Sequence, residues 1–195
     1  MLNGDVLARQ GSMVAYQGQV DFNYQGAGGV GKFLKKSFTG EGAPLMRCQG
    51  QAQIFFANNA DDVHLIYLQQ EALSVNGVNI LAFESSLSWD IHMVGGASMV
   101  AGGVFNTVLQ GTGWVAITSH GSPVILDTGQ APTFVDAQAA ICWSANLQTK
   151  LHSTFKAGAL IGRGSGELAQ LAYLGQGFVV VQAGEMTAGQ GQQTR

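Results

Sequence analysis

The chain is 195 residues long and carries a formal net charge of −3, with nine lysines and arginines in all. Charged residues make up only 11% of it, against about 25% in ordinary soluble proteins, so the basic surface that a nucleic-acid duplex requires is missing. No apolar run approaches the length of a membrane-spanning helix, and the amino terminus lacks the basic and apolar regions of a signal peptide, which leads us to expect a cytoplasmic protein.

Short predicted strands follow one another along the chain. Some alternate apolar and polar residues with a period of two, which is typical of half-buried strands, and others are continuously apolar, which is typical of strands buried on both faces. In chain order these segments are 20–24, 54–57, 87–92, 124–126, 147–151 and 178–181. Turn residues such as Asn76-Gly77 separate them, and helical periodicity is nearly absent. The pattern predicts an all-β fold.

The sequence also repeats itself. Residues 13–16 recur as 80–83, an offset of 67, and residues 80–89 recur in outline as 140–149, an offset of 60. A second anchor, Gly50-Gln51-Ala52 before an apolar run, recurs with offsets of 61 and 64. Such self-similarity indicates one supersecondary unit used three times. Three aromatic residues share one repeat position, and we expect all of them to be buried: Tyr16, Phe83 and Trp143.

These repeats predict one all-β domain over residues 1–184. We expect it to divide into three related units, at about 13–79, 80–140 and 141–182. The third unit lacks the closing strand that 73–75 gives the first, and we expect 5–8 to supply that strand and to close the units into a ring without exposed sheet edges. Residues 185–195 have nothing to bury and are predicted to be disordered.

The order and spacing of several short motifs over about residues 4–184 resemble one known family. The motifs are Gly11-Ser12-Met13-Val14, Gly40-Glu41-Gly42, Leu81-Ala82-Phe83, Gly102-Gly103-Val104-Phe105, Gly111-Thr112-Gly113 and Gly175-Gln176-Gly177. Together they look like the altered inheritance of mitochondria protein 24 family. The resemblance implies a fold similar to the tryptophan RNA-binding attenuation protein, a double-stranded β-helix-like sandwich or barrel. Eukaryotic members are linked to the organisation of the mitochondrial inner membrane, and the family brings no established catalytic or cofactor residues.

One glycine-rich segment has the spacing of a phosphate-binding loop. It reads Gly26-Ala27-Gly28-Gly29-Val30-Gly31-Lys32. That loop needs Ser or Thr after the lysine to bind magnesium, and this chain has Phe33 there. The equivalent glycine-rich stretches of the other two repeats carry no lysine in that role. We therefore predict no nucleotide site and no cofactor.

Histidines and cysteines are the remaining candidates for chemistry. His92 and His152 lie at one repeat position, and the first repeat has Gln25 there. Around a pseudo-threefold axis these three side chains could converge as metal ligands, although ordinary surface or hydrogen-bonded histidines are the favoured interpretation. Cys48 and Cys142 match small or apolar residues in other repeats, and we expect buried free thiols. No spacing typical of a catalytic nucleophile is present, so we expect no catalytic residues.

These observations favour a non-enzymatic β-scaffold that interacts with other proteins. A surface with so little charge gives little colloidal repulsion, so we expect part of it to be covered in a homo-oligomer, a dimer or a trimer. The partner is expected to be a protein or to be associated with a membrane, and not a nucleic-acid duplex. The alternative is a module that binds a small molecule or a nucleic acid, which rests on analogy with the fold.

Overall fold

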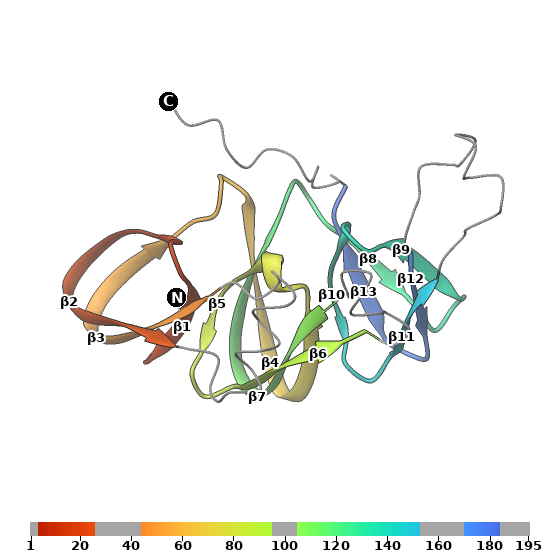
Figure 1. Cartoon of the computed structure of the whole chain (residues 1–195), viewed down its shortest axis with the longest axis horizontal. Helices are drawn as coiled ribbons and strands as arrows, with labels where there is room; N and C mark the ends of the chain where they lie inside the picture. Colours follow the sequence, from red (N-terminus) through yellow and green to blue (C-terminus); the bar gives the residue numbers. More distant parts are fainter. Residues whose placement is uncertain (1–3, 26–43, 95–104, 153–169, 184–195) are drawn as a thin grey trace.

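The computed structural model describes residues 4–25, 44–94, 105–152 and 170–183. Over these residues every regular element is a strand except the short 3-10 turn η1 (Gly77–Asn79), which confirms the predicted all-β fold. Figure 1 shows three strand-built units in a row. The glycine-rich segment with Lys32 and Phe33 and the predicted disordered tail at 185–195 lie outside the described residues.

The strands fall into the three units in chain order. The first unit contains β1 (Val6–Arg9), β2 (Met13–Gln25) and β3 (Leu45–Phe56). The second contains β4 (Asp62–Val75), β5 (Ile80–Glu84), β6 (Ser88–Met93) and β7 (Phe105–Ser119). The third contains β8 (Val124–Asp127), β9 (Thr133–Asp136), β10 (Ala140–Ser144), β11 (Gln148–His152), β12 (Gln170–Leu174) and β13 (Phe178–Val181).

Two antiparallel sheets connect these strands. The larger one has the order β2-β3-β1-β5-β7-β4-β10-β13-β8, with β6 also paired to β7, and the smaller one has the order β11-β12-β9. Long strands of the first two units correspond to pairs of shorter strands in the third. For example, β7 of the second unit pairs with both β5 and β6. In the third unit two strands take the place of β7: β13, which pairs with β10, and β12, which pairs with β11.

The same β-bulge marks the three units and confirms that they are related. One residue is extra between Met13 and Ala15 in β2, between Ile80 and Ala82 in β5, and between Ala140 and Cys142 in β10. The partner residues across the pair are Phe56, Ile117 and Val181, which are separated by the offsets of 61 and 64 found for the glycine motif. A bulge bends its strand and increases the twist. The repeat in the sequence therefore preserves a bend in the backbone.

The hydrogen-bonded pairs group the strands differently from the predicted unit boundaries. β4 pairs with β7 from Asp62 opposite Ser119 to Val75 opposite Thr107, so a unit begins with this strand and not at residue 80. By the same pairing the other units begin with β1 and β8. A repeat fixes the offset between equivalent residues, but it does not show at which strand a unit starts.

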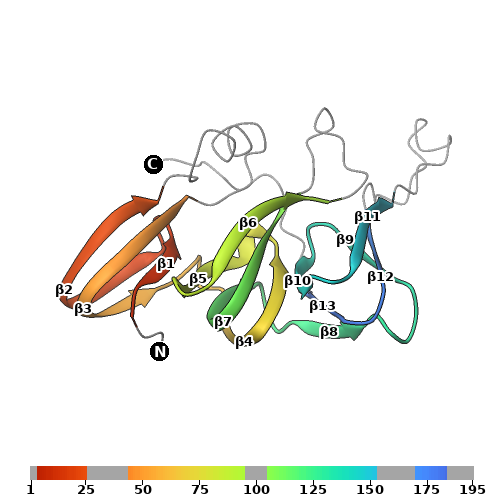
Figure 2. The ribbon, with the colours of Figure 1, turned by 90° about the horizontal axis from the view of Figure 1, so that it is seen from below.

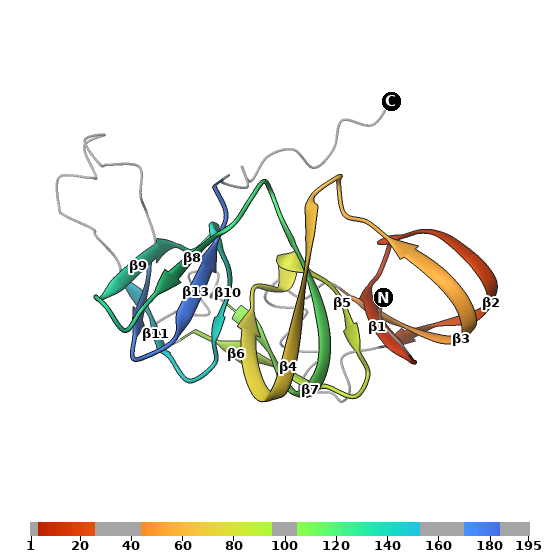
Figure 3. The same cartoon turned by 180° about the vertical axis from the view of Figure 1, so that it is seen from behind.

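The prediction that residues 5–8 close the third unit is wrong. β1 lies between β3 of its own unit and β5 of the second unit, with Leu7 opposite both Arg47 and Phe83 (Figure 2). The place that corresponds to β1 in the third unit is taken by β9, which pairs with β12. The described strands therefore form an open row, with β2 and β9 at opposite ends (Figure 3).

Two of the three repeated aromatic residues are buried as predicted, and the third is not. Phe83 and Trp143 are 0% and 3% exposed, and the ring of Trp143 packs against Tyr173 with centroids 5.4 Å apart. Tyr16 is 50% exposed, so its predicted burial is wrong. The reason is that β5 and β10 each have a strand of the preceding unit beside them, whereas the described residues place no such strand beside the start of β2.

Both cysteines are buried free thiols, as predicted. Loss of hydration on burial disfavours the thiolate, and it raises the pKa of Cys48 to about 11 and that of Cys142 to about 12. The two side chains belong to different core clusters, Cys48 with Ala82 and Ala116, and Cys142 with Leu73 and Val180. Both thiols are therefore protonated at neutral pH and lie among the packed side chains of the core.

Candidate functional site

The three candidate metal ligands occupy equivalent strand positions, and the two histidines among them have different neighbours. Gln25 lies opposite Leu45, His92 opposite Asn106 and His152 opposite Gln170, which follows the repeat offsets. The Nε2 atom of His92 is 3.8 Å from Asp90 Oδ2, whereas the ring of His152 lies tilted by 54° against the ring of Phe134, with centroids 5.1 Å apart. Among the described residues no group of three His, Cys, Asp or Glu side chains is placed to hold a metal ion.

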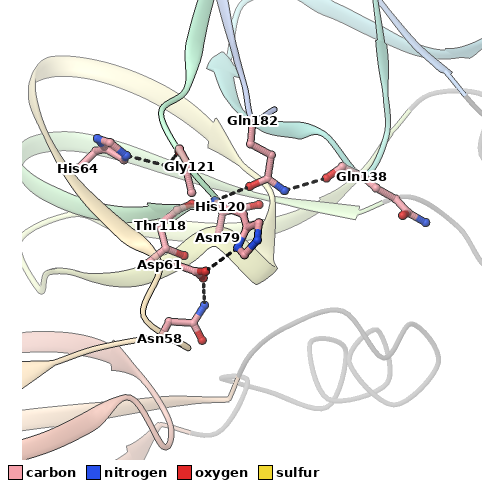
Figure 4. Close-up of polar contacts among 10 residues, drawn as sticks. Asn58, Asp61, His64, Asn79, Thr118, His120, Gly121, Gln138 and Gln182 are labelled. Carbon is pink, nitrogen blue, oxygen red and sulfur yellow. Dashed lines mark hydrogen bonds and ion pairs between the residues drawn. The ribbon is translucent and has the colours of Figure 1, made fainter. Parts of the chain in front are cut away.

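A polar cluster at the end of β7 contains the other two histidines (Figure 4). His64 Nε2 lies 2.7 Å from Ser119 Oγ, and the Ser119 hydroxyl donates to the carbonyl of Gly121 at 2.6 Å. Because that hydroxyl gives its proton to a carbonyl, its oxygen accepts from His64. This polarity is opposite to that of a serine activated by a histidine base. The pair therefore fastens β4 to the end of β7.

The second half of the polar cluster joins the units to one another. His120 Nδ1 is 3.3 Å from Asp61 Oδ1, and its backbone N–H donates to Gln182 Oε1 at 3.1 Å. The Gln182 amide in turn donates to the carbonyl of Gln138 at 3.4 Å. These contacts could not be predicted from the sequence, because the paired residues are 55, 59 and 62 positions apart and follow no spacing motif.

An open strand edge distinguishes the first unit from the second. β7 is paired along one edge by β4 over its whole length and along the other by β5 and β6. Its equivalent, β3, is paired by β2 over residues 45–56, but β1 covers only 45–48 of the other edge. The described strands therefore leave one edge of residues 49–56 unpaired.

An apolar groove of about 540 Å³ runs beside this edge. None of the side chains that line it is charged, and Gln53 is the single polar one. The first unit contributes Val6, Val20, Cys48, Ala52, Ile54, Phe55 and Phe56, and the second contributes Val63, Leu65, Leu81, Ala82 and Ala116. Such a surface suits an apolar segment and disfavours an ionic ligand, because nothing in it compensates a buried charge.

The other two units show what fills the corresponding space. In the second unit Ile66 lies opposite Val115 and Leu68 opposite Gly113, and both point into the core. In the third unit Leu126 lies opposite Val179 and packs on the core. The offset of 61 makes Ile54 the equivalent of Val115 and Ala52 the equivalent of Gly113, and both line the groove. The groove is therefore the place of a strand that the second and third units have.

No helix within the described part of the chain is long and apolar enough to cross a membrane. The sequence has no significant match among curated proteins. The fold is similar to that of a protein from Streptococcus pyogenes solved by X-ray crystallography, with a TM-score of 0.76 over 93% of this chain and 84% of that one. At 22% sequence identity this likeness shows the fold alone. The family model described as mitochondrial biogenesis AIM24 matches residues 2–184, and the chain belongs to that family.

Proposed function

We propose that this protein is a non-enzymatic, homo-oligomeric scaffold whose first unit binds an extended segment of a partner protein along β3. The observation that carries the proposal is the unpaired edge of residues 49–56 beside an apolar groove. An exposed strand edge is a template for pairing with another chain, and adding a strand to such an edge is a common way to bind a peptide.

The repeat specifies the chemistry of the bound segment. In the second unit the strand at this place runs antiparallel to β7 and points Ile66 and Leu68 inward, two residues apart. A partner segment that lies in the same way would hydrogen-bond through its backbone and place apolar side chains at alternate positions in the groove. The absence of charged lining residues favours a neutral segment.

The non-enzymatic part of the proposal is supported by the chemistry of the polar cluster. The contact between Ser119 and His64 involves a serine hydroxyl that is buried and already donates to the carbonyl of Gly121. Burial raises the pKa of both thiols, so neither is available as a thiolate. The exposed part of the described surface instead offers strand edges and apolar side chains, which are means of association.

A peptide with the sequence of residues 63–69 is the direct probe of the groove, because this segment contains no Asp, Glu, Lys or Arg and fills the equivalent place in the second unit. A fluorescently labelled peptide should bind the whole protein saturably, as measured by fluorescence anisotropy. A peptide carrying Ile66→Asp and Leu68→Asp should bind at least about tenfold more weakly, which is about 1.4 kcal/mol.

Two protein variants show whether binding uses the groove. Phe55→Glu changes an exposed groove residue, and Val124→Glu changes an exposed apolar residue of β8 outside it. Only Phe55→Glu should weaken peptide binding. If an apolar dye binds and is lost in Phe55→Glu while no peptide binds, the small-molecule alternative replaces this proposal. If single-stranded RNA binds and the peptide does not, the nucleic-acid alternative replaces it.

A further inference from the structure

We infer that copies of this protein associate head to tail, with β9 of one copy paired to the start of β2 of the next. The chain forms this junction twice within itself and leaves its two halves at opposite ends of the row (Figure 3). The inference rests on the self-assembly in the proposed function and names the surfaces that carry it. It does not depend on the groove beside β3.

The two internal junctions have one geometry. In the first, β1 pairs with β5 and Leu7 lies opposite Phe83. In the second, the end of β4 pairs with β10 and Ser74 lies opposite Trp143. The backbone contacts at their ends also correspond, since Ser85 N–H donates to the Asp5 carbonyl at 3.0 Å and Ala145 N–H donates to the Ala72 carbonyl at 3.3 Å.

The repeat offsets extend this pairing to a third junction. From Leu7 to Ser74 is 67 residues, and a further 60 residues lead to Phe134 in β9. From Phe83 the offset of 67 leads back to Tyr16 in β2. The strand pairing shows the equivalence of β9 with β1 without this count. Val6 pairs with Cys48 and Thr133 pairs with Tyr173, and Cys48 and Tyr173 are equivalent residues of the first and third units. A third junction would therefore place Phe134 opposite Tyr16.

Both halves of this third junction are uncovered. Phe134 and Tyr16 are each 50% exposed, whereas Leu7, Phe83, Ser74 and Trp143 are all buried. β2 ends the larger sheet and β9 ends the smaller one, and the described residues leave their outer edges unpaired. Residues 13–17 and 132–135 include no charged side chain, so their contact would not bury a charge.

A second copy of the chain is the partner that fits these ends. One molecule cannot join its own ends, because they lie at opposite ends of the row (Figure 1). Two surfaces that differ and complement each other give a head-to-tail contact, which forms a closed ring or a filament according to the rotation between copies. Pairing also removes two exposed strand edges, which natural proteins rarely leave open.

Charge substitutions test the junction through the mass of the assembly. Sedimentation velocity of the whole protein at tens of micromolar should show oligomers. Tyr16→Glu and Phe134→Lys should each convert them to monomers, and the variant carrying both should recover assembly because opposite charges then face each other across copies. Ile125→Lys, which changes an exposed residue of β8, is the control and should assemble normally.

Cross-linking tests the direction of the contact. Residues directly opposite in antiparallel strands have Cα atoms about 4.5–5.5 Å apart, within the range of a disulfide, about 4.4–6.8 Å. Under mild oxidation, a mixture of Tyr16→Cys and Phe134→Cys proteins should give a disulfide-linked dimer that neither protein gives alone. The native Cys48 and Cys142 are buried and should not interfere.

The possible results separate this inference from the proposed function. Self-cross-linking of Tyr16→Cys alone, or assembly unchanged by Tyr16→Glu and Phe134→Lys, would overturn the head-to-tail junction and leave self-assembly standing. A monomeric wild-type protein would overturn both the head-to-tail junction and the self-assembly of the proposed function. Peptide binding by the monomeric variants would show in either case that the groove beside β3 acts independently.

Discussion

Single buried aromatic residues hold the units together at their junctions. Truncating a buried aromatic side chain to alanine typically costs about 3–5 kcal/mol, from lost burial and an unfilled cavity. We expect Phe83→Ala and Trp143→Ala each to lower the urea midpoint strongly, and Tyr16→Ala to leave it nearly unchanged in dilute protein. Circular dichroism during urea unfolding measures this. Urea midpoints equal to that of the wild type in Phe83→Ala and Trp143→Ala would show that these rings do not stabilise the fold.

The buried thiols make stability sensitive to alkaline pH. The pKa values of Cys48 and Cys142 are raised from 9.0 to about 11 and about 12, so an unfolded chain loses these protons at lower pH than the folded one. Their contribution to stability is therefore complete below about pH 9 and is lost as the pH rises toward 11 and 12. Burial also raises the pKa of Tyr173 in the same direction.

We expect the free energy of unfolding to fall with pH above about 9 in the presence of a reductant, because the unfolded state then binds fewer protons. Cys142→Ala should make this fall shallower, since it removes one of the shifted groups and the thiol neighbour of Tyr173. Urea midpoints measured across the alkaline range check the slope. An identical slope in Cys142→Ala would rule out this thiol as a source.

At the scale of elements, β2 and β3 approach each other closely where glycines face the opposite backbone. Gly50 has a φ of +142°, and a Cβ there would collide with the carbonyl oxygen of Gln19. Gly11 has a φ of +84° with no atom within 4 Å of its Cβ position, so Gly11→Ala carries only the conformational cost. We expect Gly50→Ala to lower the free energy of unfolding by more than Gly11→Ala, whose cost is of order 1–3 kcal/mol. Equal losses in urea unfolding would mean that the strands can separate without cost.

The sequence predicted equivalence between elements better than it predicted neighbours. The offsets of 67 and 60 place the three bulges and the pairs of Gln25, His92 and His152 correctly, because equivalent residues have equivalent partners. The open edge of β3 could not be predicted, since it depends on which strand is present beside residues 49–56. The exposure of Tyr16 was mispredicted for the same reason.

At the scale of the whole molecule, association through the two ends should couple stability to concentration. A contact between copies that only the folded protein can make stabilises the folded state by mass action, so the unfolding midpoint rises with protein concentration. We expect the thermal midpoint of the wild type to rise when the protein concentration is increased about a hundredfold, and that of Tyr16→Glu to stay constant. Differential scanning calorimetry measures both. A midpoint that does not depend on concentration in the wild type would contradict the association.

The sharing of strands between neighbouring units has a consequence for how such a chain can change in length. Each unit covers the aromatic-containing strand of the next one, so β1 of the first unit covers Phe83 in β5, and β4 of the second unit covers Trp143 in β10. A molecule with one unit fewer, or with one unit duplicated, would still have an uncovered aromatic strand at one end of its row of units and an uncovered partner strand at the other. Duplication within the gene could therefore lengthen the molecule while keeping the same two ends and the same rule for joining copies.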